Sequence, residues 1–295
     1  MNILVFDIET VPDTVAGARL YNLDGLSDED IARAMTARRM QKSGSEFLPL
    51  HLHRIVAISV ALRRGDDFKV WSLGGEESPE AELITRFYDG LARYTPTLVS
   101  WNGGGFDLPV LHYRALLHRV AAPRYWEIGE QDRAFRFDNY LNRFHWRHID
   151  LMDVLAGFTP RAAAPLDEIA VMLGLPGKSG LSGADVWGAW LAGRRRAIRD
   201  YCEVDVVNTL LVYLHWEVVR GNLDAPQFDR ECARVAAWLR QSGQRHLVEF
   251  AEAWEGGDVD GGGTVDGGGD GDAGAGDGGD GAGDGDDSAG AGDGG

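Results

Sequence analysis

Cysteine is scarce in this sequence, because the 295 residues include only Cys202 and Cys232. The two thiols have neither the spacing of a metal-binding motif nor the density of a secreted disulfide scaffold. Their scarcity argues against a small disulfide-stabilised protein and against a cysteine-based zinc site. The simplest prediction is a reduced protein, and we expect a cytoplasmic location.

Long apolar stretches are also missing. The one apolar run near the start, in MNILVFDIET, is interrupted by Asp7, so we expect no signal peptide. No other stretch approaches the roughly 20 apolar residues that a membrane-spanning helix needs. The sequence therefore predicts no membrane partner, while an apolar content of 44% is normal for a protein with a folded core.

Basic residues are outnumbered by acidic ones, and their distribution is uneven. The formal net charge is −17, of which −12 comes from residues 255–295, a segment rich in Gly and Asp without Lys or Arg, leaving −5 for residues 1–254. Such a segment cannot bury enough apolar area to offset its chain entropy, so we predict a disordered C-terminal tail. Residues 1–254 are predicted to form one domain, whose mild negative charge is not typical of a strong independent nucleic-acid binder.

Within that domain the strand patterns come early and the helix patterns come late. Strand patterns cover residues 2–10, 54–73 as two strands joined by a turn, 97–101 and 144–150; helix patterns cover residues 28–40, 79–94, a helix from Asp107, 166–173, 184–191, 198–219 and a last segment to Trp254. This order predicts an α/β fold in which helices flank a mixed sheet. The helix at 28–40 carries Arg33, Arg38 and Arg39, which form either a solvated face or a face toward a substrate.

The first strand carries an acidic pair, Asp7 and Glu9, near its end. Residues two apart in a strand project from the same face, so the two carboxylates lie side by side. Their repulsion and lost hydration cost several kcal/mol unless a cation lies between them or the strand end opens to solvent. The pair therefore predicts a cation site or an exposed strand end.

Two later segments carry further acidic residues next to predicted helices. In WNGGGFDLPVL, three glycines allow close approach of backbone or ligand, and Asp107 begins a helix, where a lone Asp most often acts as an N-cap. In DYCEVDVVNTLLVYLHW, apolar residues at 3-4-3-4 spacing predict the buried stripe of a helix. Tyr201 and Asp205 are four apart and share a second stripe at the rim of that core.

If the three segments converge, Asp7, Glu9, Asp107 and Asp205 place four carboxylates in one cleft. Oxygen ligands of this kind suit hard divalent cations such as Mg²⁺ or Mn²⁺. Two such ions roughly 4 Å apart can activate water, hold a scissile phosphate and stabilise the leaving oxygen. We therefore expect two divalent metal ions as cofactors, although spacing alone does not establish the convergence.

The segments FDIET, NGGGFD and YCEVD resemble, in order and spacing, the three exonuclease motifs of the DEDD superfamily. The tyrosine variant, DEDDy, is indicated, because the histidine variant would carry histidine where this chain has Asp200. FLPLHLHRIVAISVAL and GLPGKSGLSGADVW further resemble predicted 3'-5' exonucleases related to the proofreading domain of family B DNA polymerases. This resemblance covers about residues 1–220. It implies a ribonuclease H-like fold with a mixed five-stranded sheet flanked by helices.

The resemblance also implies roles for the five motif residues. Asp7 would bridge both metals, Glu9 and Asp205 would hold the metal that activates water, and Asp107 would hold the other metal. Tyr201 would orient the attacking water, because a phenol with an ordinary pKa near 10 is a poor base at neutral pH.

Four further residues are candidate substrate-binding residues. Thr10 and Asn102 lie where the family contacts the 3'-terminal nucleotide. Phe106 either stacks on a base or packs in the core. Lys178, in a Gly-rich loop, is either a phosphate contact or an ordinary surface lysine.

The expected activity is metal-dependent 3'-5' exonuclease hydrolysis at the 3' ends of single-stranded nucleic acid, with DNA as the favoured substrate. Two alternatives stay open: an exoribonuclease that trims RNA ends, as related superfamily members do, and a catalytically silent module that binds nucleic acid or a partner. The presence of all five motif residues argues against the silent module. Because the domain is mildly acidic, weak substrate binding or delivery by a protein partner is expected.

Overall fold

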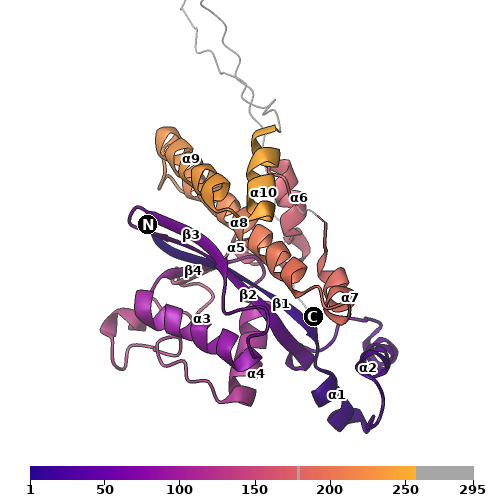
Figure 1. Cartoon of the computed structure of the whole chain (residues 1–295). Helices are drawn as coiled ribbons and strands as arrows, with labels where there is room; N and C mark the ends of the chain where they lie inside the picture. Colours follow the sequence, from indigo (N-terminus) through magenta and orange to yellow (C-terminus); the bar gives the residue numbers. More distant parts are fainter. Residues whose placement is uncertain (178–179, 257–295) are drawn as a thin grey trace, which may run out of the picture. The chain divides into compact units, whose positions relative to one another are not determined.

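Five strands form one mixed sheet in the computed structural model, which describes residues 1–177 and 180–256. The strands lie in the order β3-β2-β1-β4-β5 (Figure 1). β1 pairs antiparallel with β2 and parallel with β4; β3 pairs antiparallel with β2, and β5 pairs parallel with β4. The bounds are β1 Asn2–Pro12, β2 His53–Arg64, β3 Asp67–Ser72, β4 Thr97–Ser100 and β5 His148–Asp150.

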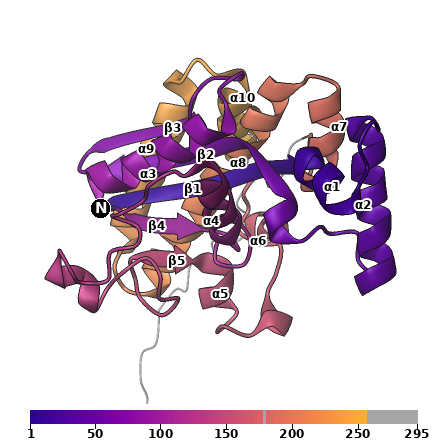
Figure 2. The same ribbon diagram turned by 90° about the horizontal axis from the view of Figure 1, so that it is seen from below.

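Helices cover both faces of this sheet. α3 and α4 pack on one face, and α8 packs on the other face together with α9 and α10 (Figure 1). α1 and α2 lie beyond the end of β1, in the insertion that precedes β2 (Figure 2). The bounds are α1 Thr14–Tyr21, α2 Asp28–Ser43, α3 Glu80–Tyr94, α4 Asp107–His118, α5 Leu151–Leu155, α6 Leu166–Met172, α7 Val186–Leu191, α8 Arg195–Val219, α9 Ala225–Gln241 and α10 Arg245–Gly256.

β1 lies at the centre because its apolar side chains are buried on both faces. Ile3 and Val5 belong to the core that contains α8, whereas Leu4 and Phe6 belong to the core that contains α3 and α4. Successive side chains of a strand alternate between faces, so Asp7 follows Ile3 and Val5 onto the face covered by α8. The alternation of the strand thus directs the first acidic residue toward the longest helix described.

The sheet and its helices confirm the predicted fold class, an α/β fold with a mixed five-stranded sheet. Within residues 1–177 and 180–256, none of the helices combines the length and the apolar character needed to cross a bilayer. α10 extends to Gly256, slightly into the segment predicted as a tail, and the tail from residue 257 onward lies outside the described residues.

Two predicted elements differ from the observed ones. The strand predicted at 144–150 is limited to β5, because the residues before β5 lie in turns. In these turns the Nε of Arg147 donates to the carbonyl of Asp138 at 2.6 Å. The last helical segment is two helices, α9 and α10. Gly243 lies between them with a φ of 69°, a left-handed conformation that ends the first helix.

A buried ion cluster joins the insertion to the rest of the fold. Arg114 of α4 donates from Nε and Nη2 to the two carboxylate oxygens of Glu80, at 2.7 and 2.6 Å, and its Nη1 donates to Asp13. Glu80 also accepts from the backbone N–H of Ile55 in β2 at 2.7 Å. Asp13 caps α1. The sequence patterns did not predict this helix. The three charged side chains are at most 6% exposed. The cluster therefore holds α1, α3, α4 and β2 together.

We expect Arg114→Ala to lower the free energy of unfolding by about 3–5 kcal/mol, because it leaves two buried carboxylates without their cation. Urea denaturation followed by circular dichroism measures this loss. Arg86→Ala is the matched control, since Arg86 forms an exposed pair with Glu82 on α3, and such pairs contribute about 0.3–0.5 kcal/mol. Equal losses in the two variants would contradict the role given to the cluster.

Candidate active site

One pocket collects acidic side chains from three separate elements. β1 contributes Asp7 and Glu9, the start of α4 contributes Asp107, and α8 contributes Tyr201 and Asp205. The pocket has a volume of about 440 Å³, within the roughly 300–1,000 Å³ of small-molecule sites. We call it the carboxylate pocket. The five motif residues, which come from three distant segments of the sequence, therefore line one cavity.

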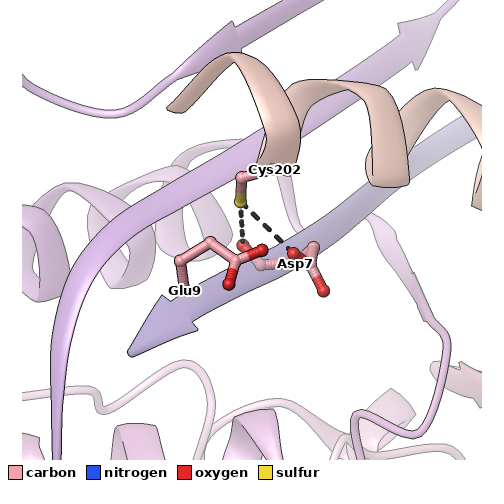
Figure 3. Close-up of side chains that lie close together, drawn as sticks. All are labelled: Asp7, Glu9 and Cys202. Atoms are coloured by element: carbon pink, nitrogen blue, oxygen red, sulfur yellow. Dashed lines mark hydrogen bonds between the residues drawn. The ribbon is translucent and has the colours of Figure 1, made fainter. Parts of the chain in front are cut away.

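Asp7 and Glu9 lie side by side on the face of β1 that α8 covers (Figure 3). Their ligand oxygens and the Sγ of Cys202 all lie within 4.8 Å of one another. The pairing of β1 with β2 shifts register directly after Glu9, so the strand is irregular where it leaves the pocket. This local irregularity separates the acidic pair from the following residue, Thr10.

Cys202 is a neighbour of the site that sequence reasoning missed. Its thiol donates to the Oδ2 of Asp7 at 3.3 Å and to the carbonyl oxygen of Asp7 at 3.4 Å (Figure 3). Complete burial raises the pKa of this thiol, and the negative charges of Asp7 and Glu9 raise it further. The group is therefore a protonated donor that orients Asp7. The available signal was its place between Tyr201 and Asp205 on one helix.

Asp107 does not act as the N-cap that its position alone suggested. α4 begins at Asp107, the capping residue is Phe106 without a side-chain bond, and the Oδ1 of Asp107 accepts from the backbone N–H of Ile8 in β1 at 3.1 Å. Burial raises the pKa of Asp107 to about 7. The hydrogen bond from Ile8 acts to lower this pKa, and the charge of Asp150 acts to raise it. The side chain thus ties α4 to the strand that carries the acidic pair.

Asp150, a second residue that sequence reasoning missed, holds the glycine-rich loop at the edge of the pocket. Its carboxylate accepts from the backbone N–H groups of Asn102 and Gly104, both at 2.8 Å. Asn102 lines the carboxylate pocket with a left-handed φ of 61°. A side chain at Gly103 would collide with that of Ser100. The loop therefore needs its glycine to bring Asn102 and Asp107 to the pocket.

Tyr201 lies among the carboxylates of the pocket. Burial raises the pKa of its phenol above the ordinary value near 10, and the negative charges of Asp205, Glu9 and Asp7 raise it further. The phenol consequently stays protonated at neutral pH. It can donate a hydrogen bond but cannot serve as a general base.

Of the remaining predicted site residues, Phe106 lines the carboxylate pocket, Thr10 lies beside it and Lys178 is outside the described residues. A neighbouring groove, which we call the aromatic groove, is lined by Thr10, Phe47, Phe106 and Trp187 and also by Glu9. The Oγ1 of Thr10 lies 2.9 Å from the Nδ1 of His53 in β2. Phe106 and Phe47 are in ring contact, at 5.7 Å between centroids, and both line the groove and the pocket. Lys178 lies outside the described residues.

The donor set of the carboxylate pocket fits a hard divalent cation. Asp7 and Glu9 hold ligand oxygens within 4.8 Å of each other, and Asp107 and Asp205 line the same pocket. Carboxylate oxygens favour Mg²⁺, Ca²⁺ or Mn²⁺ over soft metals. Burial raises the pKa of Asp107 to about 7, so the charged form of this carboxyl needs a compensating positive charge. The carboxylates that line the pocket are thus of the type that suits a hard cation.

The family to which the chain is similar agrees with this arrangement. A family model described as a predicted 3'-5' exonuclease related to the exonuclease domain of PolB matches residues 45–254, more than two thirds of the chain. Asp107, Tyr201 and Asp205 lie within the matched residues, whereas Asp7 and Glu9 precede them. No curated protein matches the chain.

The variant Asp107→Asn tests the raised pKa. An unfolded Asp has a pKa of about 3.9 and the folded one of about 7, so the folded protein binds the proton more tightly and loses stability as the pH rises between these values. Asparagine cannot ionise. In EDTA, we therefore expect the melting temperature of Asp107→Asn relative to wild type to be higher at pH 8 than at pH 5, by at least about 2–4 °C.

The matched control is Asp89→Asn, which changes an exposed carboxylate of α3. Its melting temperature relative to wild type should differ little between the two pH values. Thermal unfolding followed by circular dichroism measures both variants. An Asp107→Asn difference that does not grow with pH would refute the burial-raised pKa.

Proposed function

This chain belongs to the family of predicted 3'-5' exonucleases related to the exonuclease domain of PolB, and on that premise we propose that it hydrolyses single-stranded DNA from its 3' end. Water adds to the phosphorus of the last phosphodiester and the 3' oxygen of the preceding nucleotide leaves, which releases a nucleoside 5'-monophosphate. The observation that carries the proposal is the carboxylate pocket, where β1, α4 and α8 supply all five motif residues.

Divalent cations complete this proposal, because an acidic pocket repels a phosphodiester unless positive charge lies between them. Asp7 would be shared by two ions, Mg²⁺ or Mn²⁺, with Glu9 and Asp205 on one of them and Asp107 on the other. Bound there, the ions would supply activated water and neutralise charge on the phosphate and the leaving oxygen. The thiol of Cys202 fixes the orientation of Asp7, since it donates to Oδ2.

Tyr201 positions the attacking water in the proposed reaction. The raised pKa of its phenol keeps the hydroxyl proton in place, so the group acts as a fixed hydrogen-bonding partner rather than as a base. Burial of the ring restricts its rotation, which favours a single orientation of the hydroxyl. The proton of the attacking water must therefore pass to another acceptor.

We expect Asp7→Asn to abolish shortening of the substrate. Asparagine keeps an oxygen that can accept from Cys202, but it removes the charge that two cations would share. Full-length wild type and variant are incubated with matched 5'-labelled single-stranded DNA and RNA oligonucleotides in Mg²⁺ or Mn²⁺. Wild type should produce a ladder that shortens from the 3' end, and the variant should leave the oligonucleotides intact.

The substrate that yields the ladder decides between DNA and RNA. Equal melting temperatures of the two proteins would show that the loss is not due to unfolding. A wild type that leaves both substrates intact, or an Asp7→Asn variant with wild-type turnover, would overturn the proposed function.

We expect Tyr201→Phe to slow the chemical step by about 10- to 100-fold, as loss of a hydrogen bond to a charged or polarised group does. Single-turnover rates on labelled DNA measure this effect, and calorimetric titration with Mn²⁺ should give an affinity close to that of wild type. Tyr213→Phe is the control, because Tyr213 lies in the core on the same helix, away from the pocket lining. An unchanged rate in Tyr201→Phe would remove the phenol from the mechanism.

A further inference from the structure

A second pocket, formed by the insertion between β1 and β2, has the opposite charge to the carboxylate pocket. Arg38, Arg39 and Lys42 of α2 line it together with His51. Within the described part of the chain, its lining includes no Asp or Glu. We call it the basic pocket. Three cations around one cavity of about 520 Å³ are notable in a chain whose formal net charge is −17.

The cations of the basic pocket differ from the other arginine of the same helix. Arg33 forms ion pairs with Glu29 and Asp30, at 3.3 and 3.1 Å, and does not line the basic pocket. The sequence left open whether the arginines of this helix form a solvated face or face a substrate. The structure divides them, because Arg33 is neutralised locally while Arg38 and Arg39 line a cavity.

Two contacts hold the shape of the basic pocket. The guanidinium of Arg38 lies over the ring of Tyr21 of α1, at 4.8 Å from its centroid. The Nε of Arg39 donates to the carbonyl oxygen of Phe47 at 2.9 Å. The first contact ties α2 to α1, and the second ties α2 to the segment that leads back into β2. The cations are therefore carried on an anchored element.

The basic pocket is linked to the active site by shared lining residues. Leu48 lines both the basic pocket and the aromatic groove. Glu9, Phe47 and Phe106 line both the aromatic groove and the carboxylate pocket. α2 lies beyond the end of β1 that carries the acidic pair (Figure 2). The aromatic groove thus shares lining residues with both pockets.

We propose that the basic pocket binds the phosphodiester backbone of the single strand whose 3' end occupies the carboxylate pocket. The inference rests on the proposed function and adds a site for nucleotides upstream of the scissile bond. Arg38 and Lys42 supply the positive charge that neutralises backbone phosphates. Phe47, with 56% of its surface exposed, and Trp187 offer aromatic faces between the two pockets, on which bases of any sequence can stack.

The test is the salt dependence of binding by the double variant Arg38→Ala, Lys42→Ala. Binding of a 5'-fluorescein-labelled dT20 is followed by anisotropy at several salt concentrations, in the full-length Asp7→Asn background with Mg²⁺ so that the strand is not shortened. Each phosphate contact contributes about 0.7 to the slope of log K against log salt for single strands. We expect the double variant to weaken binding and to reduce the slope by about 1.4.

Two comparison variants separate charge from structure. Arg33→Ala removes a cation of the same helix that lies outside the basic pocket, and it should retain the affinity and the slope of its parent. The swap Arg38→Lys, Lys42→Arg keeps both charges and should retain most of the slope. Equal slopes for the double alanine variant and its parent would overturn the inference, and so would an equal effect of Arg33→Ala.

Substrate length supplies a second measurement. A dT20 can reach from the carboxylate pocket to the basic pocket, whereas a trinucleotide has fewer upstream phosphates to offer. In an otherwise wild-type chain, the double alanine variant should therefore raise KM more for dT20 than for dT3, and an equal rise for both would refute the inference.

A wild type that binds dT20 with the expected slope but releases no nucleotide would overturn the proposed function alone. If the wild type degrades dT20 but the double alanine variant keeps the salt slope of its parent, this inference alone is overturned.

Discussion

Repulsion between carboxylates on one strand face is the constraint on which the candidate site depends. Asp7 and Glu9 share the face of β1 that α8 covers (Figure 3). Burial raises the pKa values of both Tyr201 and Cys202, and the charges of Asp7 and Glu9 raise them further. These two groups consequently stay protonated and can face carboxylates as donors. The backbone N–H of Ile8 serves Asp107 in the same way. Because these hydrogen-bond donors face carboxylates, β1, α4 and α8 can bring their acidic groups into one pocket.

The carboxylates keep their places through residues that do not line the pocket. Asp150 fixes the backbone of Asn102 and Gly104, and the helix that carries Asp107 starts directly after this loop. Farther along α4, Arg114 bonds to Glu80 and thereby to the backbone of β2. β2 is hydrogen-bonded to β1 along nearly its whole length. β1, which carries the acidic pair, and α4, which carries Asp107, are therefore both connected to β2. These connections limit how far repulsion between the carboxylates can separate the two elements.

Periodicity predicted most of the fold, because burial on one or two faces leaves a direct trace in the sequence. The central strand, the hairpin of β2 and β3 and the long helix α8 were all apparent from apolar spacing. Hydrogen bonds between distant residues leave no such trace, so the roles of Asp150 and Cys202 were missed, and so was the bond from Ile8 that Asp107 accepts in place of capping α4. The motifs named five of the residues that line the carboxylate pocket, but only the folded chain could show that Thr10 lies in the adjoining groove.

The connection from β1 to β2 explains how opposite charges come to lie near each other without cancelling. After the acidic pair the chain continues through three more residues of β1, forms α1 and α2, and returns through Phe47 to β2. Arg39 bonds to the carbonyl of Phe47, whose ring lies between the carboxylate pocket and the aromatic groove. The cations thus remain outside the carboxylate pocket, where a guanidinium would occupy the place of the metal ions in the proposed function. Placed along the groove, the same charge can hold an anionic strand while the acidic pair stays available for cations.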